Sequence, residues 1–141
     1  MKDADPRALE LLEQPILGHL GFLGLDRYPH VAAVWFDYRD GEILVASKPS
    51  EFKCRSLRAD GHAAFEVSTA ESPYGSAMIS GDATVEVLPE PRRIEFVGKM
   101  VSKYLGDEAG KKYIERWSKG GHPGDGDLIR IRPRKIGYYA G

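Results

Sequence analysis

The stretch PHVAAVWFDYRDGEILVAS, residues 29–47, has two apolar segments on either side of the dipeptide Asp40-Gly41. An Asp-Gly pair between apolar runs is a strong signal for a β-hairpin, because the tight turn needs residues that accept a positive φ. The stretch therefore predicts two paired strands, residues 30–38 and 42–47. Neither strand carries an obvious catalytic acid, base or nucleophile.

Further apolar segments extend this hairpin into a larger antiparallel sheet. The expected strands are HLGFLGL (19–25), HAAFEVST (62–69), AMISGDATVEVL (77–88), and the closing segments LIRIRP and KIGYY. Within residues 77–88, Gly81 indicates a bulge or a close approach of another backbone.

Helical spacing appears before and between these strands. Residues 5–15 predict a short helix with Asp5 as its cap and Pro6 in its first position. Residues 50–60 predict another, with Ser50 as N-cap, and the segments from Pro89 to Trp117 predict two more. Six or seven strands with added helices indicate a mainly β protein, a small closed or partly closed β-barrel.

Composition narrows the class of protein. The chain has 141 residues, 42% of them hydrophobic and 29% charged, with a formal net charge of −1. A near-neutral balance argues against binding to nucleic acid or a membrane surface, and no apolar run approaches the ~20 residues of a membrane span. The N-terminal residues do not have the pattern of a signal peptide. We expect a single-domain cytoplasmic protein over residues 1–141.

Candidate catalytic and metal-binding side chains are few. The single cysteine, Cys54, lies between Lys53 and Arg55, which can activate a thiol, but a free cysteine is more often a small hydrophobe of the core. The four histidines lack metal-ligand spacing. GGHPGDG (120–126) lacks the spacing of a phosphate loop and reads as a surface loop that can act as a lid. We predict no catalytic side chain and no metal ligand.

The segment SKPSEFKCRSLR, residues 47–58, is more informative. Ser47 and Lys48 leave the end of a strand, and Lys53, with further arginines, follows on the next helix. Backbone N–H groups at a helix start, together with serine and lysine side chains, form an anion site, and phosphate is the obvious biological anion. The alternative is a solvated basic helix face.

The apolar hairpin can hold the other part of a ligand whose phosphate lies at this anion site. Ala32 and Ala33 are small enough to let a flat ring approach the backbone, and Trp35 and Phe36 can wall it, although aromatic strand residues are more often plain core. A planar heterocycle at one end and a phosphate at the other describe flavin mononucleotide (FMN) or a close relative. Such a cofactor carries the redox chemistry, so the protein needs no acid or base of its own.

These segments, in this order, resemble the pyridoxamine 5′-phosphate oxidase-like, or flavin/deazaflavin oxidoreductase, split-barrel superfamily. The matching positions are Val34-Trp35-Phe36 in the second strand, Lys53, Leu57 and Asp60 after it, and Gly81. The sequence departs from the family pattern at Ala33 and Gly61, where many members have proline, and at Ser56, where many have asparagine. KIGYYAG lacks the Arg/Trp substrate motif of true pyridoxamine phosphate oxidases, so that activity is not expected.

The resemblance implies a homodimer of six-stranded antiparallel split β-barrels of the FMN-binding type, with a cofactor at the interface. By the same resemblance, Ser47 and Lys53 contact the cofactor phosphate with Lys48 as a further candidate, and Ala33, Val34 and Trp35 lie along the ring. Residues 78–81, Trp117 and Tyr138 are then expected near the interface. FMN is the expected cofactor, with the deazaflavin F420 as the alternative.

The function that follows is an FMN- or F420-binding oxidoreductase. It would transfer hydride between a reduced nucleotide cofactor and a small organic substrate. The alternative is a non-enzymatic protein of the same fold, a flavin or haem carrier or a redox sensor. His30 and His62 are the candidate haem ligands.

Overall fold

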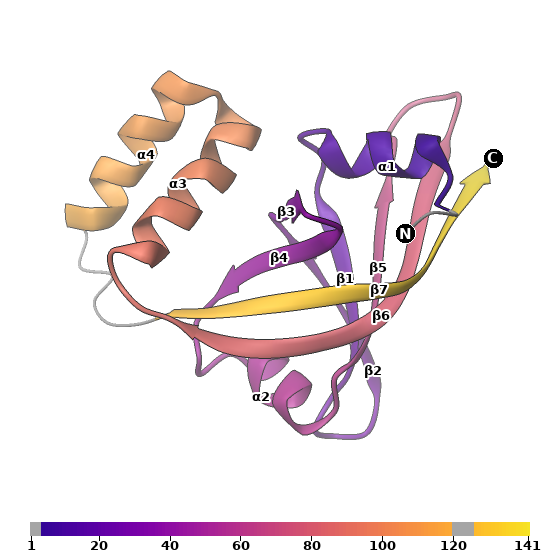
Figure 1. Cartoon of the computed structure of the whole chain (residues 1–141), viewed down its shortest axis with the longest axis horizontal. Coiled ribbons are helices and arrows are strands. Elements are labelled where there is room, and N and C mark those ends of the chain that lie inside the picture. Colours follow the sequence, from indigo (N-terminus) through magenta and orange to yellow (C-terminus); the bar gives the residue numbers. More distant parts are fainter. Residues whose placement is uncertain (1–3, 120–125) are drawn as a thin grey trace.

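A computed structural model describes residues 4–119 and 126–141 of the chain (Figure 1). One seven-stranded sheet accounts for the described strands, which are β1 (Gly18–Leu23), β2 (Pro29–Val34), β3 (Asp37–Arg39), β4 (Glu42–Ser47), β5 (His62–Ser68), β6 (Gly75–Leu88) and β7 (Gly126–Ala140). The helices are α1 (Pro6–Glu13), α2 (Phe52–Ala59), α3 (Arg92–Leu105) and α4 (Asp107–Lys119). The predicted mainly β, antiparallel class is confirmed. None of the helices in the described ranges is long and apolar enough to cross a membrane.

The order of strands shows how the sheet closes. Neighbouring strands run antiparallel in the order β2-β1-β5-β6-β7-β4-β3. β2 and β3 lie at opposite edges of this order, yet only Trp35 and Phe36 separate them in the chain. The sheet must therefore curl until its edges meet, which makes a barrel.

The predicted hairpin is confirmed at its turn but not along its first strand. Asp40 and Gly41 have φ values of 52° and 78°, as a tight Asp-Gly turn requires. The expected strand over 30–38 is instead broken at Trp35 and Phe36 into β2 and β3. The Phe36 N–H donates to the Tyr104 hydroxyl oxygen (3.2 Å) rather than to a strand, and its fully buried ring packs edge-on against Phe65.

The two longest strands, β6 and β7, pair along almost their whole length. LIRIRP and KIGYY are one continuous strand, so the expectation of two separate strands was wrong. The register slips between Ser80, which opposes Lys135, and Gly81, which opposes Pro133. A Cβ on Gly81 would lie 2.4 Å from the Arg132 carbonyl oxygen, so both the bulge and the close backbone approach predicted at Gly81 are confirmed.

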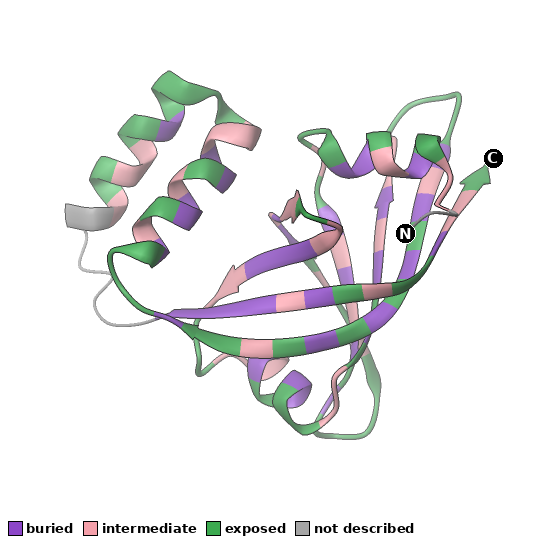
Figure 2. Ribbon diagram, viewed as in Figure 1, coloured by how far each residue is buried: buried purple, intermediate pink, exposed green. Residues whose placement is uncertain are grey.

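The barrel interior holds the main core. Along β6 as far as Thr84, buried residues alternate with exposed or half-buried ones, the period of a sheet with one covered face (Figure 2). The first four residues of β7, 126–129, are all buried, because both faces of the sheet are covered there. The fully buried side chains include Leu20, Phe36, Ile43, Phe65, Ile129 and Ile131. α1 packs against this core through Ala8, Leu11 and Leu12, and Asp5 caps it by accepting from the Arg7 N–H (2.9 Å), as predicted.

The helices α3 and α4 form a hairpin beside the barrel (Figure 1). Apolar side chains of α3 pack with residues of β4 and β7 in a second cluster made of Leu44, Leu88, Phe96, Val97, Met100, Val101 and Leu128. At the end of α3, Lys103 Nζ donates to the carbonyl oxygens of Leu12 (3.1 Å) and Phe36 (3.2 Å). Burial lowers the pKa of Lys103 to about 8.

Tyr104 ties three parts of the chain together. Its hydroxyl accepts from the Phe36 N–H and donates to the Ile16 carbonyl oxygen (3.0 Å). It therefore links α3 to the β2–β3 junction and to the segment after α1.

We predict that Tyr104→Phe lowers the free energy of unfolding by about 1–3 kcal/mol, because it leaves two partly buried backbone groups without their partner. Urea unfolding followed by circular dichroism measures the change. Tyr139→Phe is the matched control, because the Tyr139 side chain is exposed and its hydroxyl makes no hydrogen bond within the described residues. Equal stability of the two variants would contradict this role for Tyr104.

Candidate functional site

The three residues predicted to contact a phosphate lie together where β4 ends and α2 begins. Ser47 is the last residue of β4, Lys48 follows it, and Lys53 lies in the first turn of α2. A carboxylate that the sequence analysis missed joins the two lysines. Glu51 accepts the Lys48 N–H (3.4 Å) and forms an ion pair with Lys53 Nζ, whose side chain is only 17% exposed.

Glu51, not the predicted Ser50, is the N-cap residue of α2, and its side chain makes no capping hydrogen bond. Burial raises the pKa of the Glu51 carboxyl, but the hydrogen bond and charge of Lys53 outweigh this, so the pKa lies below its usual value. An internal anion therefore already lies at the helix start, where a phosphate is expected. Its position two residues before Lys53 was the only available sign of it in the sequence.

The far side of this cluster comes from β7. Ser47 is the register partner of Asp127, which is 1% exposed. Asp127 Oδ2 forms an ion pair with Arg58 of α2, and Arg58 Nη1 also donates to the Pro49 carbonyl oxygen (3.5 Å). Asp127 could not be foreseen, because only the pairing of β4 with β7 brings it to α2.

Two polar atoms of this cluster lack partners. Within the described residues, Ser47 Oγ and Asp127 Oδ1 are the buried side-chain oxygens without a hydrogen bond. A buried polar group without a partner is costly, and such groups are generally completed by water or a ligand. The Ser47 hydroxyl is close enough to the Glu51 carboxyl and the Cys54 thiol to lower the pKa of each, so a phosphate oxygen that accepts from it would take the place of the Glu51 carboxylate.

The residues predicted to lie along the cofactor ring have three different surroundings. Ala33 is exposed on the outer face of β2, while Val34 points into the barrel core. Trp35 is half-buried beside α3, where its ring stacks on Tyr104 at 5.1 Å with an interplanar angle of 8°. Of these side chains, only that of Ala33 is exposed on a surface of the sheet, and the predicted ring contacts stay predictions.

Ala33 belongs to a broad outer sheet face of small and apolar residues. The register places Val31, Gly21, Ala64 and Ser80 in one row across four strands, and Ala33, His19, Glu66 and Met78 in the next. Val31 is 74% exposed and Met78 49% exposed. A shallow hollow of about 230 Å³ lies at Met78, Ser80 and Gly137. We call these two rows the outer sheet face.

The two other aromatic residues expected near the interface have partners within the chain. Trp117 packs in the apolar cluster beneath α3 and α4, with the Arg93 guanidinium 4.8 Å above its ring. Tyr138 is half-buried, and the guanidinium of Arg7 lies 4.3 Å from its ring centre.

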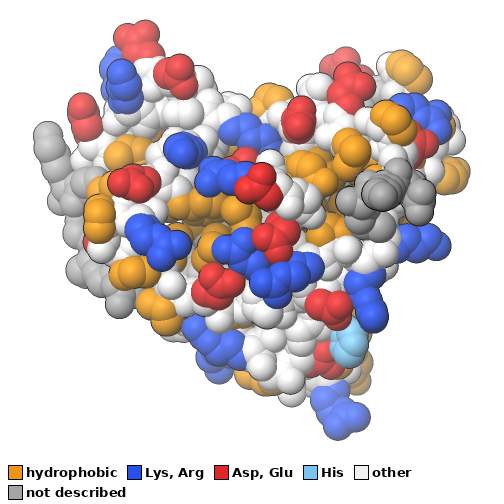
Figure 3. Space-filling model, in the orientation of Figure 1, with side chains coloured by type: hydrophobic (Ala, Val, Ile, Leu, Met, Phe, Trp, Pro, Cys, Tyr) orange, Lys and Arg blue, Asp and Glu red, His pale blue; other side chains and the backbone are white. Residues whose placement is uncertain are grey.

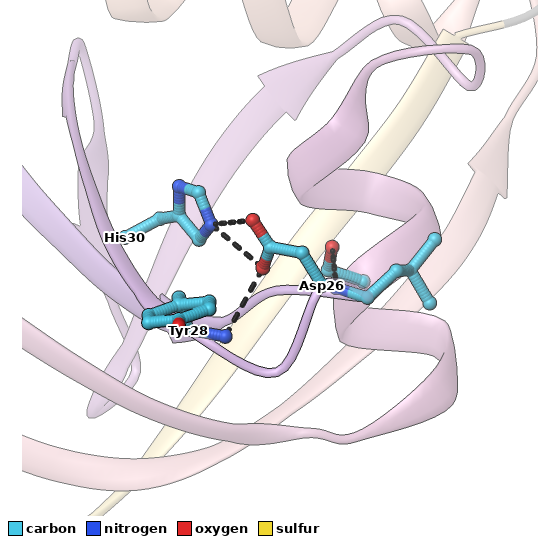
Figure 4. A network of polar contacts seen from close by, with 5 residues as sticks. Asp26, Tyr28 and His30 are labelled. Atoms are coloured by element: carbon cyan, nitrogen blue, oxygen red, sulfur yellow. Dashed lines mark hydrogen bonds and ion pairs between the residues drawn. The ribbon is translucent and has the colours of Figure 1, made fainter.

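Both candidate haem ligands pair with a carboxylate, since His62 Nδ1 lies 2.7 Å from Asp60 Oδ1, but His30 also packs against an aromatic ring. Figure 4 shows His30 Nε2 directed at both carboxylate oxygens of Asp26 (2.9 and 2.8 Å), while the Tyr28 N–H donates to Asp26 (3.1 Å). The His30 ring stacks on Phe22 with its centre 5.5 Å away. The His62 side chain is 82% exposed.

Two positions of the family pattern, Ser56 in α2 and Asp60 directly after it, have structural roles. Asp60, the residue that follows α2, accepts from the backbone N–H of His62 (2.9 Å), which holds the pKa of its carboxyl below the usual value. Ser56, which stands where many members have asparagine, accepts from the Leu25 N–H (3.1 Å). Ser56 therefore fixes α2 to the turn between β1 and β2, and Asp60 fixes the end of α2 to the start of β5.

The other candidates of the sequence analysis were a metal site, the glycine-rich segment and Cys54. No group of three or more His, Cys, Asp or Glu residues that can hold a metal ion occurs among residues 4–119 and 126–141. GGHPGDG lies outside the described residues, except for Gly126. Cys54 is fully buried, and burial raises the pKa of its thiol.

We predict that Cys54 does not react with a thiol reagent at neutral pH in the folded protein. The reactive thiolate is scarce when the pKa is raised, and the sulfur is shielded from the reagent. Absorbance during treatment with a chromogenic disulfide measures the reaction, with the protein in concentrated guanidinium chloride as the control. Rapid stoichiometric labelling of the folded chain would contradict the assignment of Cys54 to the core.

Comparison with known proteins defines the fold. No family model matches the sequence, and no curated protein matches it. Among solved structures, the chain is similar to an F420 reductase at 24% identity and a TM-score of 0.70, covering 91% of this chain and 94% of that one. It is similar to a putative pyridoxamine 5′-phosphate oxidase from Listeria innocua at 19% identity and a TM-score of 0.64, covering 96% and 97%.

A third similar structure is the haem storage protein HutZ from Vibrio cholerae, at 14% identity and a TM-score of 0.68, covering 96% of this chain and 93% of that one. These likenesses confirm the predicted split-barrel fold of the pyridoxamine 5′-phosphate oxidase-like and F420 reductase structures. The proteins with this fold include both enzymes and binding proteins, so the fold alone does not decide between these functions.

Proposed function

We propose that this protein binds FMN or F420 through the cluster at the β4–α2 junction and works as a flavin- or deazaflavin-dependent oxidoreductase. The observation that carries the proposal is the buried, unpartnered hydroxyl of Ser47 beside Lys48, Lys53 and Arg58. The likeness in fold to an F420 reductase supports it.

The donor set suits a phosphate. Lys53 and Lys48 supply positive charge, and Ser47 supplies an O–H donor. The Asp127 carboxylate pairs with Arg58 and holds its guanidinium in place. Because Asp127 is buried, its carboxylate does not compete with a phosphate at the surface. Glu51 is the group that a phosphate must replace as the partner of Lys53.

The cofactor would supply hydride transfer when bound. The chain's own part is to hold the phosphate, to orient the ring by backbone and small side chains, and to keep water from the reacting face. No side chain among the described residues is needed as a nucleophile for such chemistry.

We also propose a homodimer that covers the outer sheet face. Val31 and Ala33 of β2 and Met78 of β6 are exposed apolar side chains on this face, on either side of the His19–Glu66 ion pair (3.1 Å). A second copy of this face is its natural partner in a two-fold dimer. The ring of a cofactor whose phosphate lies at Ser47 would then be enclosed between subunits.

A second candidate function is haem binding without catalysis. The observation in its favour is His30, whose ring is oriented by Asp26 and stacked on Phe22. A carboxylate on one ring nitrogen is the usual device for orienting a metal-ligating histidine. Haem titration followed in the Soret region, on the wild type and on His30→Ala, separates this candidate from flavin binding.

We predict that Lys53→Ala weakens the binding of FMN or F420 by about 1–3 kcal/mol, the range for a charge-assisted hydrogen bond. Glu51→Gln should act in the opposite direction, because it removes the carboxylate that competes with the phosphate. Titration calorimetry measures both, with Lys111→Ala on α4 as the matched control. If both variants weaken binding equally, the pair is structural and the phosphate site lies elsewhere.

We predict that the protein is dimeric at micromolar concentration and that Met78→Glu shifts it to monomer. A charge at a packed apolar interface is strongly unfavourable unless it is paired. Size-exclusion chromatography with light scattering measures the mass. Leu105→Glu on α3 is the control, because Leu105 is similarly exposed (43%) but lies outside the outer sheet face. A monomeric wild type would refute the dimer.

A further inference from the structure

A second cavity lies on the opposite side of β4 and β7, beneath α3. It has a volume of about 190 Å³. Its floor consists of Leu44, Leu88, Phe96 and Leu128, none of them more than 8% exposed. In the space-filling view, the face of the molecule between the helical hairpin and the barrel is hollowed, with apolar side chains at the bottom and both basic and acidic ones around it (Figure 3).

One arginine and one lysine side chain at the mouth of this cavity are free to bind an anion. Arg92 and Lys99 lie two turns apart on α3, and neither forms a hydrogen bond or ion pair with any residue in the described part of the chain. Glu95, between them, is the carboxylate of the lining. The two cations therefore exceed this carboxylate by one charge.

The other two cations of the lining are already compensated. Arg130 forms ion pairs with Glu42 (2.7 Å) and Glu86 (2.9 Å). Arg39 forms one with Asp37 (2.6 Å). These pairs hold the walls in place, so an incoming anion is left to Arg92 and Lys99.

From this arrangement we propose that the cavity binds a small aromatic carboxylate, an anion of about the size of benzoate. The parts of Leu44, Leu88, Phe96 and Leu128 that reach the cavity would contact the ring, and Arg92 and Lys99 would pair with the carboxylate at the mouth. The size is suitable, because an apolar cavity of about 150 Å³ is large enough to hold benzene.

The dimensions and the lining exclude other anions. A nucleotide or a lipid headgroup with its chains is far larger than this space. An inorganic phosphate or sulfate would leave the apolar floor uncovered and would gain nothing from it. The ligand must therefore combine a compact apolar body with a single terminal negative charge.

This site is independent of the proposed cofactor site. Leu44 and Leu128 face α3, whereas Ser47 and Asp127 belong to the alternate residues of the same two strands. A result that refutes the cofactor site would leave this cavity unchanged, and the reverse also holds.

The direct test is titration of the full-length protein with sodium benzoate, followed by calorimetry and by methyl NMR. Benzamide, which has the same shape without the charge, is the matched ligand. We expect saturable benzoate binding, at millimolar affinity or better. The methyl shifts should appear at Leu88 and Leu128, which line only this cavity. Benzamide should bind more weakly.

The site must also be distinguished from the larger groove of about 640 Å³ between α3 and α4, which Glu95 and Lys99 also border. Methyl shifts at Ile114, which lines only that groove, would place the ligand there and overturn the proposal. Absent binding, or equal binding of benzamide, would overturn it as well.

Substitutions at the mouth test the role of charge. Arg92→Gln and Lys99→Met should each weaken benzoate binding roughly tenfold, which corresponds to the loss of one charge-assisted contact. Glu95→Gln should strengthen it, and a gain of affinity cannot arise from misfolding. Lys112→Met is the matched control, because Lys112 is an exposed lysine of α4 that borders neither this cavity nor the groove between α3 and α4. Unchanged affinity in all three cavity variants would refute the assignment.

Discussion

The link of two residues between β2 and β3 is the constraint on which the rest of the structure depends. These strands lie at opposite edges of the sheet order, so Trp35 and Phe36 can join them only if the sheet curls into a barrel. The backbone of Phe36 leaves the strand ladder there, and Tyr104 and Lys103 of α3 supply the hydrogen bonds that it loses. The helical hairpin therefore completes the closure of the barrel, in addition to covering one side of it.

The strand order also creates the candidate site. It puts β4 beside β7, so that Ser47 meets Asp127, and α2, which follows β4, presents Lys53 and Arg58 at the same place. Because successive side chains of β4 and β7 point to opposite faces of the sheet, each face contributes to a different site. One set of residues serves the cluster with the unpartnered Ser47 hydroxyl, while Leu44 and Leu128 form the floor of the cavity beneath α3.

Much of this could be predicted from local patterns, and what could not has identifiable causes. Asp40-Gly41 and the apolar alternation predicted the turn of the hairpin and most strands correctly. The break at Phe36 was hidden because its partner, Tyr104, lies 68 residues away. The two closing segments form one strand because Pro133 lies at the β-bulge, where a missing N–H is tolerated.

The same division holds for the site. Ser47, Lys48 and Lys53 follow one another closely, so the sequence could group them, and their role at a phosphate stays a prediction. The place of Asp127 depends on strand pairing, and that of Glu51 on which residue begins the helix.

The measurement that tests the central claim most directly is a comparison of FMN with riboflavin on the wild-type protein by flavin fluorescence titration. The two ligands share the ring and differ by the phosphate alone. If the Ser47–Lys53 cluster is a phosphate site, FMN binds at least tenfold more tightly than riboflavin, the change that about 1.4 kcal/mol produces. The same preference should hold for F420 over its phosphate-free chromophore, if the deazaflavin is the cofactor. Equal affinities within either pair would contradict a phosphate site at the β4–α2 junction.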